Sequence, residues 1–288
     1  MEQPSEPPKT SEPGNNSQDA TRDASSSSTS KDLAEIDKIK ALLRSKNDTQ
    51  MFAGLALLRS VLDNSPHLQT DAEAVYDLWK SIDGKFIHRL VKTGSKPSSK
   101  DDSKSMLDLG VSVLHTFAVL LPRTALEESK FTNRITVLVP AALHGSEETT
   151  EMLLQLLYTL ASTEKGARAI FKVEDLSPLT EIASTNPKAL DILRFAFLNT
   201  MGSADDIPSL RKRVDETIQS LASSFKGTDA VTFLGFLGSF LRQADPTVCS
   251  IPLLLSSFIL SSAGLILFCR LSQQIQPGYR VLFITSGV

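Results

Sequence analysis

The residues that most often carry chemistry in proteins are sparse in this chain. Its four histidines, His67, His88, His115 and His144, lie in four separate segments and share no metal-ligand spacing. His115 stands inside an apolar stretch, where a core histidine with a satisfied ring is the expected state. No G-x-S-x-G, G-x-G-x-x-G, P-loop, H-E-x-x-H or C-x-x-C motif occurs. We therefore predict no catalytic, cofactor-binding or metal-binding residue, and no enzymatic activity.

Two pairs of adjacent carboxylates are the remaining candidates for acid–base chemistry. Asp101-Asp102 lies in a stretch rich in Lys and Ser that we expect to be a loop. Glu147-Glu148 lies at an expected helix start, where the helix dipole favours acidic side chains. The two cysteines, Cys249 and Cys269, can form neither a disulfide framework nor a cysteine-based zinc site. None of these residues indicates catalysis.

Two features are candidates for binding a partner. Arg211, Lys212 and Arg213 form a short basic cluster that could contact a phosphate or an acidic partner, and the alternative is a solvated helix face. Trp79 is the only tryptophan, and Trp is enriched at the centres of protein interfaces. Its helical spacing from apolar neighbours favours a core position as the alternative.

The elements that position these residues are predicted to be helices. The chain has 288 residues, 41% of them hydrophobic, and a formal net charge of −3, which gives no electrostatic reason to expect a nucleic-acid partner. Apolar segments bounded by Gly, Pro or Ser/Thr/Asp clusters follow one another from residue 31 to 245, and none alternates with a period of two. Ile135 to Val139 is the one stretch that could form a strand, and it is isolated. The sequence therefore predicts an all-α fold.

The apolar helices recur at intervals that suggest a repeat. Their centres lie near Leu57, Val113, Leu156 and Leu193, at intervals of 56, 43 and 37 residues. These intervals are close to the repeat length of ~40–47 residues in HEAT and armadillo arrays. Residues 207–225 instead carry a narrow apolar stripe backed by charge, which is typical of an outer helix. Alternating inner and outer helices predict an armadillo/HEAT-like α-solenoid.

One stretch of sequence also resembles a known family. "LLRSKNDTQMFAGLALLRSVLDNS" followed by "VYDLWKSIDGKFIHRLVKT" resembles the N-terminal part of the neurochondrin family, particularly its fungal members. The likeness is strongest from Leu33 to Val91, continues as helical patterning to about Leu241, and departs from the family pattern after about Asp245. It implies an armadillo-like superhelix without catalytic residues. It also implies binding and scaffolding of other proteins, linked in some members to signalling or neurite growth.

The two ends of the chain differ from the helical part. Residues 1–30 are rich in Ser and Pro and predict a disordered tail. Residues 246–288 form an apolar segment, and Ile251 to Cys269 is a candidate transmembrane helix without a charged residue. The alternatives are a non-homologous C-terminus, from a frame change or a retained intron, and a buried helix.

These patterns lead to three functional hypotheses. The first is a non-catalytic scaffold that binds other proteins through its helical repeat domain, residues 31–245, in the cytoplasm. The second is an adaptor tethered to a membrane through Ile251 to Cys269. The third is an enzyme with an unrecognised site. Neither a cofactor nor a nucleic-acid partner is predicted.

Overall fold

The computed structural model describes residues 34–96, 101–201, 207–225 and 230–244. Every regular element in these ranges is helical, which confirms the predicted all-α class. Helical residues 34–43 come first, and the remaining helices follow in this order: α2 (Asp48–Asn64), α3 (Pro66–Thr70), α4 (Ala72–Ser81), α5 (Gly84–Gly94), α6 (Asp101–Leu120), α7 (Arg123–Leu126), α8 (Ser129–Thr132), α9 (Ile135–Ala141), α10 (Glu147–Ala161), α11 (Glu164–Phe171), α12 (Ser177–Ile182), α13 (Pro187–Met201), α14 (Ile207–Ser224) and α15 (Ala230–Gln243).

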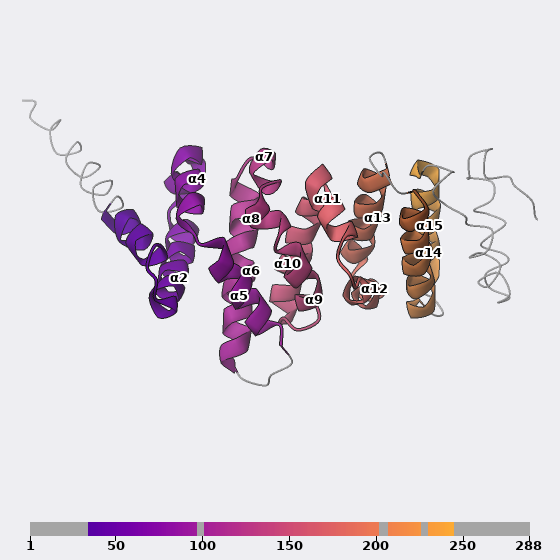
Figure 1. Cartoon of the computed structure of the whole chain (residues 1–288), viewed down its shortest axis with the longest axis horizontal. Helices are drawn as coiled ribbons and strands as arrows, with labels where there is room; N and C mark the ends of the chain where they lie inside the picture. The colour runs from indigo at the N-terminus through magenta and orange to yellow at the C-terminus, as the bar shows by residue number, and fades with distance from the viewer. Residues whose placement is uncertain (1–33, 97–100, 202–206, 226–229, 245–288) are drawn as a thin grey trace, which may run out of the picture.

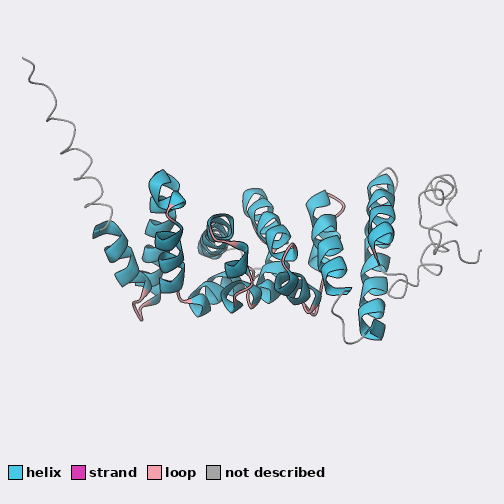
Figure 2. Ribbon diagram, turned by 90° about the horizontal axis from the view of Figure 1, so that it is seen from above, coloured by secondary structure: helices cyan, strands magenta, loops and turns pink. Residues whose placement is uncertain are grey.

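The helices stack along one long axis (Figures 1 and 2), which Figure 1 colours from indigo at the N-terminal end to orange and yellow at the C-terminal end. One row consists of α2, α6, α10, α13 and α15, each of which contacts the next. In the second row α5 contacts α9, α9 contacts α11 and α12, and α12 contacts α14. Each helix thus packs against near neighbours in the chain, which is the arrangement of an α-solenoid. The predicted solenoid class is confirmed.

Polar side chains begin many of these helices. The Asn47 Oδ1 atom accepts the Thr49 N–H at 2.9 Å and so satisfies one of the first-turn amides, which lack a partner inside α2. Such a cap stabilises a helix by about 0.5–2 kcal/mol. Equivalent caps begin four further helices and come from Asp71, Asp83, Ser146 and Thr163.

Two sequence-based boundaries were placed differently from the structure. Asp101 and Asp102, which we expected in a loop, lie in the first turn of α6, so the connection from α5 is shorter than predicted. Ile135 to Val139, the one candidate strand, belongs to helix α9 and is buried at Ile135, Leu138 and Val139. Residues 1–30 and 246–288, including the candidate transmembrane helix 251–269, lie outside the described residues. Among the helices of the described ranges, none is long and apolar enough to cross a membrane.

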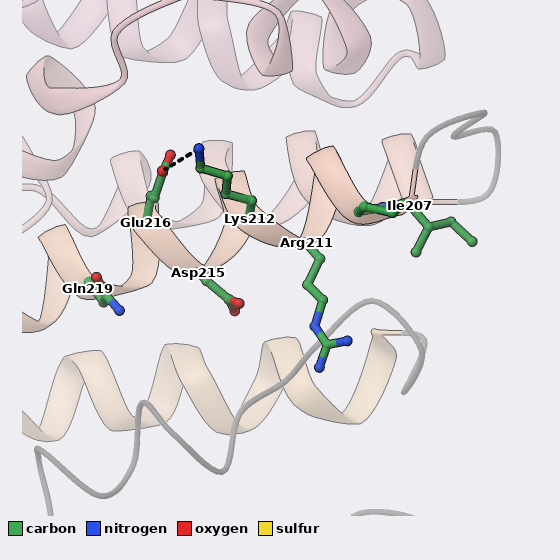
Figure 3. A pocket seen from close by; sticks show the side chains of 7 residues that line it. Ile207, Arg211, Lys212, Asp215, Glu216 and Gln219 are labelled. Carbon is green, nitrogen blue, oxygen red and sulfur yellow. Dashed lines mark ion pairs between the residues drawn. The ribbon is translucent and has the colours of Figure 1, made fainter.

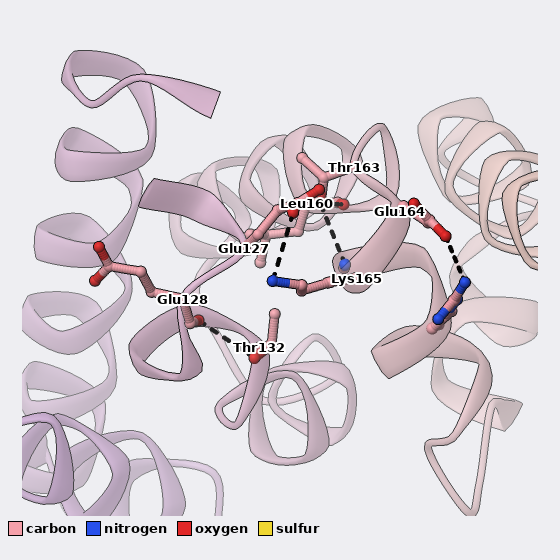
Figure 4. A network of polar contacts seen from close by, with 9 residues as sticks. Glu127, Glu128, Thr132, Leu160, Thr163, Glu164 and Lys165 are labelled. Carbon is pink, nitrogen blue, oxygen red and sulfur yellow. Dashed lines mark hydrogen bonds and ion pairs between the residues drawn. The ribbon is translucent and has the colours of Figure 1, made fainter. Parts of the chain in front are cut away.

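The core is a continuous apolar cluster that runs through the array from Ile36 to Ala244. Close helix contact requires small residues at specific points, and a Cβ atom on Gly54 of α2 would lie 2.9 Å from the Leu42 Cβ atom of the preceding helix. Polar contacts connect the turns at the edge of the array (Figure 4). Lys165 at the start of α11 pairs with Glu127 at 3.8 Å, beside the Thr163 cap. The apolar core holds the helices together along the array, and these polar contacts at its edge join consecutive helices.

Candidate protein-binding site

Trp79, predicted as a candidate contact residue, lies in the core. Only 1% of its surface is exposed, and its ring stacks on Phe131 with centroids 4.4 Å apart and meets Phe117 at 5.2 Å. The Lys130 ammonium group donates to the Trp79 carbonyl oxygen at 2.8 Å and lies 5.2 Å from the centre of the ring. A side chain this buried cannot contact a partner directly, so the assignment of Trp79 to a binding surface was wrong.

The predicted basic cluster on α14 divides into two parts. Arg211 and Lys212 are exposed, as Figure 3 shows. Arg213 points the other way: its guanidinium donates to the carbonyl oxygens of Val173 and Glu174 and lies 5.5 Å from the ring of Phe171. Because successive residues of a helix are about 100° apart, the three cations do not form one surface. Arg213 joins α14 to the connection between α11 and α12.

The exposed part of this cluster lines a shallow hollow of about 490 Å³ along α14 (Figure 3). Lys212 pairs with Glu216 at 3.8 Å, and Arg211 lies one turn from Asp215. Two cations and two carboxylates therefore balance one another in the lining. The role of Arg211 and Lys212 in partner binding stays a prediction.

The histidines whose side chains the structure describes lie on different elements: His88 on α5, His115 on α6 and His144 in the turn after α9. Burial lowers the pKa of His115 on α6, and the Lys188 ammonium group adds to this effect. Burial, with the charges of Arg134 and Lys92, also lowers the pKa of His88 on α5, whereas His144 is exposed in the turn after α9. Across the described ranges, no group of three or more His, Cys, Asp or Glu residues is placed to hold a metal ion.

The second carboxylate pair lies where the sequence predicts it. Glu147 and Glu148 form the first turn of α10, directly after the Ser146 cap, and both are exposed. There their negative charges lie at the positive end of the helix dipole and stabilise the helix, which accounts for both residues without a catalytic role.

The structure also contains a surface groove that the sequence did not predict. It lies between α2, α5 and the start of α6, near the N-terminal end of the array (Figure 1). One part, which we call the apolar compartment, has a volume of about 580 Å³. Phe86 and Leu90 of α5 are buried in its floor, and Phe52 of α2 and Met106 of α6 are half-buried in its walls.

A second hollow of about 520 Å³, the basic compartment, adjoins the first. It lies between the turn that precedes α2 and the turn that joins α4 to α5, and it is lined by the exposed cations Arg44, Lys46 and Lys80. Asp48 and Arg89 line both compartments, and their ion pair, with Nη2 and Oδ1 2.7 Å apart, separates them. We refer to the two compartments together as the N-terminal groove.

Sequence reasoning missed this groove because its walls come from three helices that only the fold brings together. The sequence signal for it was weak: Phe52 directly follows Met51, and successive residues of a helix point about 100° apart, so the two side chains face different directions. The structure buries Met51 and leaves Phe52 half-buried at the edge of the apolar compartment.

Comparison with known proteins agrees with this helical architecture. The sequence profile of the neurochondrin family matches residues 31–256. The chain belongs to the neurochondrin family. The match includes every helix that lines the N-terminal groove and also the hollow on α14 of this neurochondrin-family chain. The predicted family is confirmed.

Two solved structures of engineered proteins also resemble this neurochondrin-family chain. One is 15% identical, with 83% of this chain and 94% of the other covered and a TM-score of 0.45. The second is 14% identical, with 83% and 57% covered and a TM-score of 0.45. No curated protein matches the chain significantly.

Proposed function

We propose that this chain is a non-catalytic interaction protein that binds other proteins on the surface of its helical array, in the cytoplasm. The observation that carries the proposal is the N-terminal groove, where the apolar side chains of Phe52 and Met106 stay partly open to solvent beside three exposed cations. Partly exposed apolar surface beside polar residues is typical of a protein interface. Membership of the neurochondrin family and the solenoid fold support the same function.

Affinity purification of the tagged full chain tests this proposal. We expect specific proteins to co-purify above a control that carries the tag alone, and to bind the purified chain with a measurable dissociation constant by isothermal titration calorimetry. If no protein is enriched and none binds on reconstitution, the chain is not an interaction protein.

A membrane-tethered adaptor is the second candidate function. It is favoured by the sequence of Ile251 to Cys269, whose 19 residues carry no charge. A carbonate wash of the membrane fraction tests it, because an inserted helix stays in the pellet. The matched control is the double variant Leu254→Arg/Leu265→Arg, which we expect to be released. Release of the unaltered chain contradicts the tether and leaves the binding function in place.

A further inference from the structure

The charges of the basic compartment are unequal. Four cations line it, namely Arg44, Lys46, Lys80 and Arg89, against the two carboxylates Asp48 and Asp83. Within the described part of the chain, neither Arg44, Lys46 nor Lys80 forms an ion pair. Lys80 lies over the ring of Tyr76 at 4.3 Å, and Asp77, which pairs with Lys40, is close enough for its charge to act on Lys80 and Arg44. The compartment therefore attracts anionic groups.

Both carboxylates of this compartment already have partners. Asp48 pairs with Arg89, and Asp83 accepts the Lys85 N–H at 2.9 Å as the cap of α5. Two carboxylate charges also cannot balance the four cationic charges of the lining. An incoming carboxylate therefore meets a site with an excess of positive charge.

The apolar compartment accepts a different group. Its floor of Phe86 and Leu90 and its walls of Phe52 and Met106 form an apolar surface that is open on one side. A large apolar side chain placed there removes both surfaces from water, at roughly 25 cal/mol per Å² of apolar area. Because one ion pair borders both compartments, we expect a short extended segment, at ~3.4 Å per residue, to reach from one to the other.

We propose that the N-terminal groove binds an extended segment of a partner protein in which acidic residues lie about two positions from a large apolar residue. The acidic residues contact Arg44, Lys46 and Lys80, and the apolar side chain enters the compartment between Phe52 and Met106. The proposal rests on the proposed interaction function and names the chemistry of the partner.

The chain's own terminal segments do not match both compartments. Residues 1–30 contain five acidic residues, but their only hydrophobic residues are Met1, Ala20 and Ala24. Residues 246–288 are apolar and contain neither Asp nor Glu. Within these two ranges Met1 is the only large apolar residue that lies near an acidic residue, Glu2, and no Leu, Ile or Phe does, so we take the complementary occupant to be another protein.

Fluorescence anisotropy with the full chain tests the proposal. The probe is a labelled pool of hexapeptides that carry three Asp or Glu residues, one Gly or Ser residue, and then two residues drawn from Leu, Ile and Phe. One control pool replaces the acids with Lys, and another replaces the apolar residues with Ser. We expect the first pool to bind about tenfold or more tightly than either control, a difference of about 1.4 kcal/mol. Equal binding of the acidic and basic pools would overturn the proposal.

Variants locate the binding on the surface. Lys46→Glu/Lys80→Glu reverses two exposed charges of the basic compartment, and we expect it to weaken binding about tenfold or more and to favour the Lys pool. Lys172→Glu/Arg242→Glu is the matched control, with the same change of charge at two exposed positions outside the groove, and we expect it to bind as the unaltered chain does. Equal weakening by both double variants would show that only net charge matters.

The apolar compartment has its own variant. Met106→Glu places a charge in the wall of the apolar compartment and is expected to reduce binding about tenfold. Circular dichroism shows whether this variant is folded. If it unfolds, Phe52→Ser takes its place. Full binding by a folded variant would overturn the apolar part of the proposal.

Two further outcomes separate the proposal from its alternatives. Sedimentation with vesicles of phosphatidylserine and phosphatidylcholine tests a membrane ligand. If the chain binds vesicles but not the acidic–apolar pool, and Lys46→Glu/Lys80→Glu releases it, the groove binds lipid and the proposal is wrong. If proteins co-purify equally with the unaltered chain and with all groove variants, the chain is an interaction protein, but the N-terminal groove is not where it binds.

Discussion

The guanidinium group of Arg134 lies directly against the backbone of Gly84. Arg134 Nε donates to the Gly84 carbonyl oxygen at 3.0 Å, and Nη1 donates to the Ser129 carbonyl oxygen at 2.9 Å. A Cβ atom on Gly84 would lie 2.4 Å from Nη2, well inside contact distance. Arg134 exposes 8% of its surface, so the charge has little access to water, and burial lowers its pKa. This contact joins the start of α5 to the start of α9.

Replacing this glycine is therefore expected to destabilise the array. Gly84→Ala pushes the guanidinium away from its carbonyl partner, and a buried donor left without a partner costs about 1–3 kcal/mol. Gly235→Ala is the matched control: its added Cβ meets nothing within 4 Å in the middle of α15, and it should stabilise by about 0.5–1 kcal/mol. Urea denaturation measures both. A Gly84→Ala variant as stable as the control would show that Arg134 moves aside without cost.

Substitution at Trp79 should affect stability rather than binding. Trp79→Ala leaves a cavity beside Phe131 and Phe117 and is expected to cost about 3–5 kcal/mol, whereas Trp79→Phe keeps most of the packing and costs less. Urea unfolding followed by circular dichroism measures the change, with the exposed substitution Arg211→Ala as a control that stays within about 0.5 kcal/mol. If Trp79→Ala kept full stability but lost its co-purifying proteins, the core position would be contradicted.

Stability should decrease in mild acid. Burial lowers the pKa of both His115 and His88 in the folded chain, while the unfolded value is about 6.5. The unfolded state therefore binds more protons, and the free energy of unfolding falls as the pH drops below about 6.5 through the folded pKa values. His115→Gln should reduce this slope, whereas His144→Gln at an exposed turn should leave it unchanged. Urea titrations at a series of pH values measure it, and equal slopes for the two variants would exclude His115 as a source.

A single cation affects the pKa of two groups on neighbouring helices. Lys188 of α13 pairs with Glu151 of α10, which also accepts the Asn186 amide at 2.9 Å, and both contacts lower the pKa of Glu151. Lys188→Met should raise the pKa of Glu151 and also that of His115, since both lose a nearby positive charge. Nuclear magnetic resonance titration measures the two values. Because the pair is partly exposed, the loss of stability should stay below about 1 kcal/mol. Unchanged pKa values would contradict this arrangement.

The sequence was most informative where burial follows helical periodicity. The stripe on α14 is buried at Leu210, Val214, Ile218 and Leu221, as its spacing predicts. At the start of the same helix Ile207 is 44% exposed, because the end of a helix has fewer neighbours than its middle. Helical periodicity also places Arg211 and Arg213 on different faces of α14. Which of the two faces inward depends on the position of the Val173 carbonyl group, which the sequence of α14 alone does not give.

The candidate binding site was much less predictable. Phe52, Phe86 and Met106 lie on three different helices, and each of them fits an ordinary core position when its own segment is considered alone. The partial exposure of Phe52 and Met106 and the burial of Phe86 depend on how α2, α5 and α6 pack together, which no single segment of sequence shows. The cations that give the basic compartment its positive charge are also far apart in the sequence: Arg44 precedes α2, and Lys80 lies in the last turn of helix α4.

The stack of near-neighbour helices has a consequence for the kinetics of folding. Since the helices contact mainly near neighbours along the chain, such as α5 with α6 and α10 with α13, few contacts require the closure of a long loop. Such low contact order favours rapid folding, and nucleation can begin at any interface and propagate in both directions. The walls of the N-terminal groove form when α5 and α6 join α2, before α13 to α15 have to be in place.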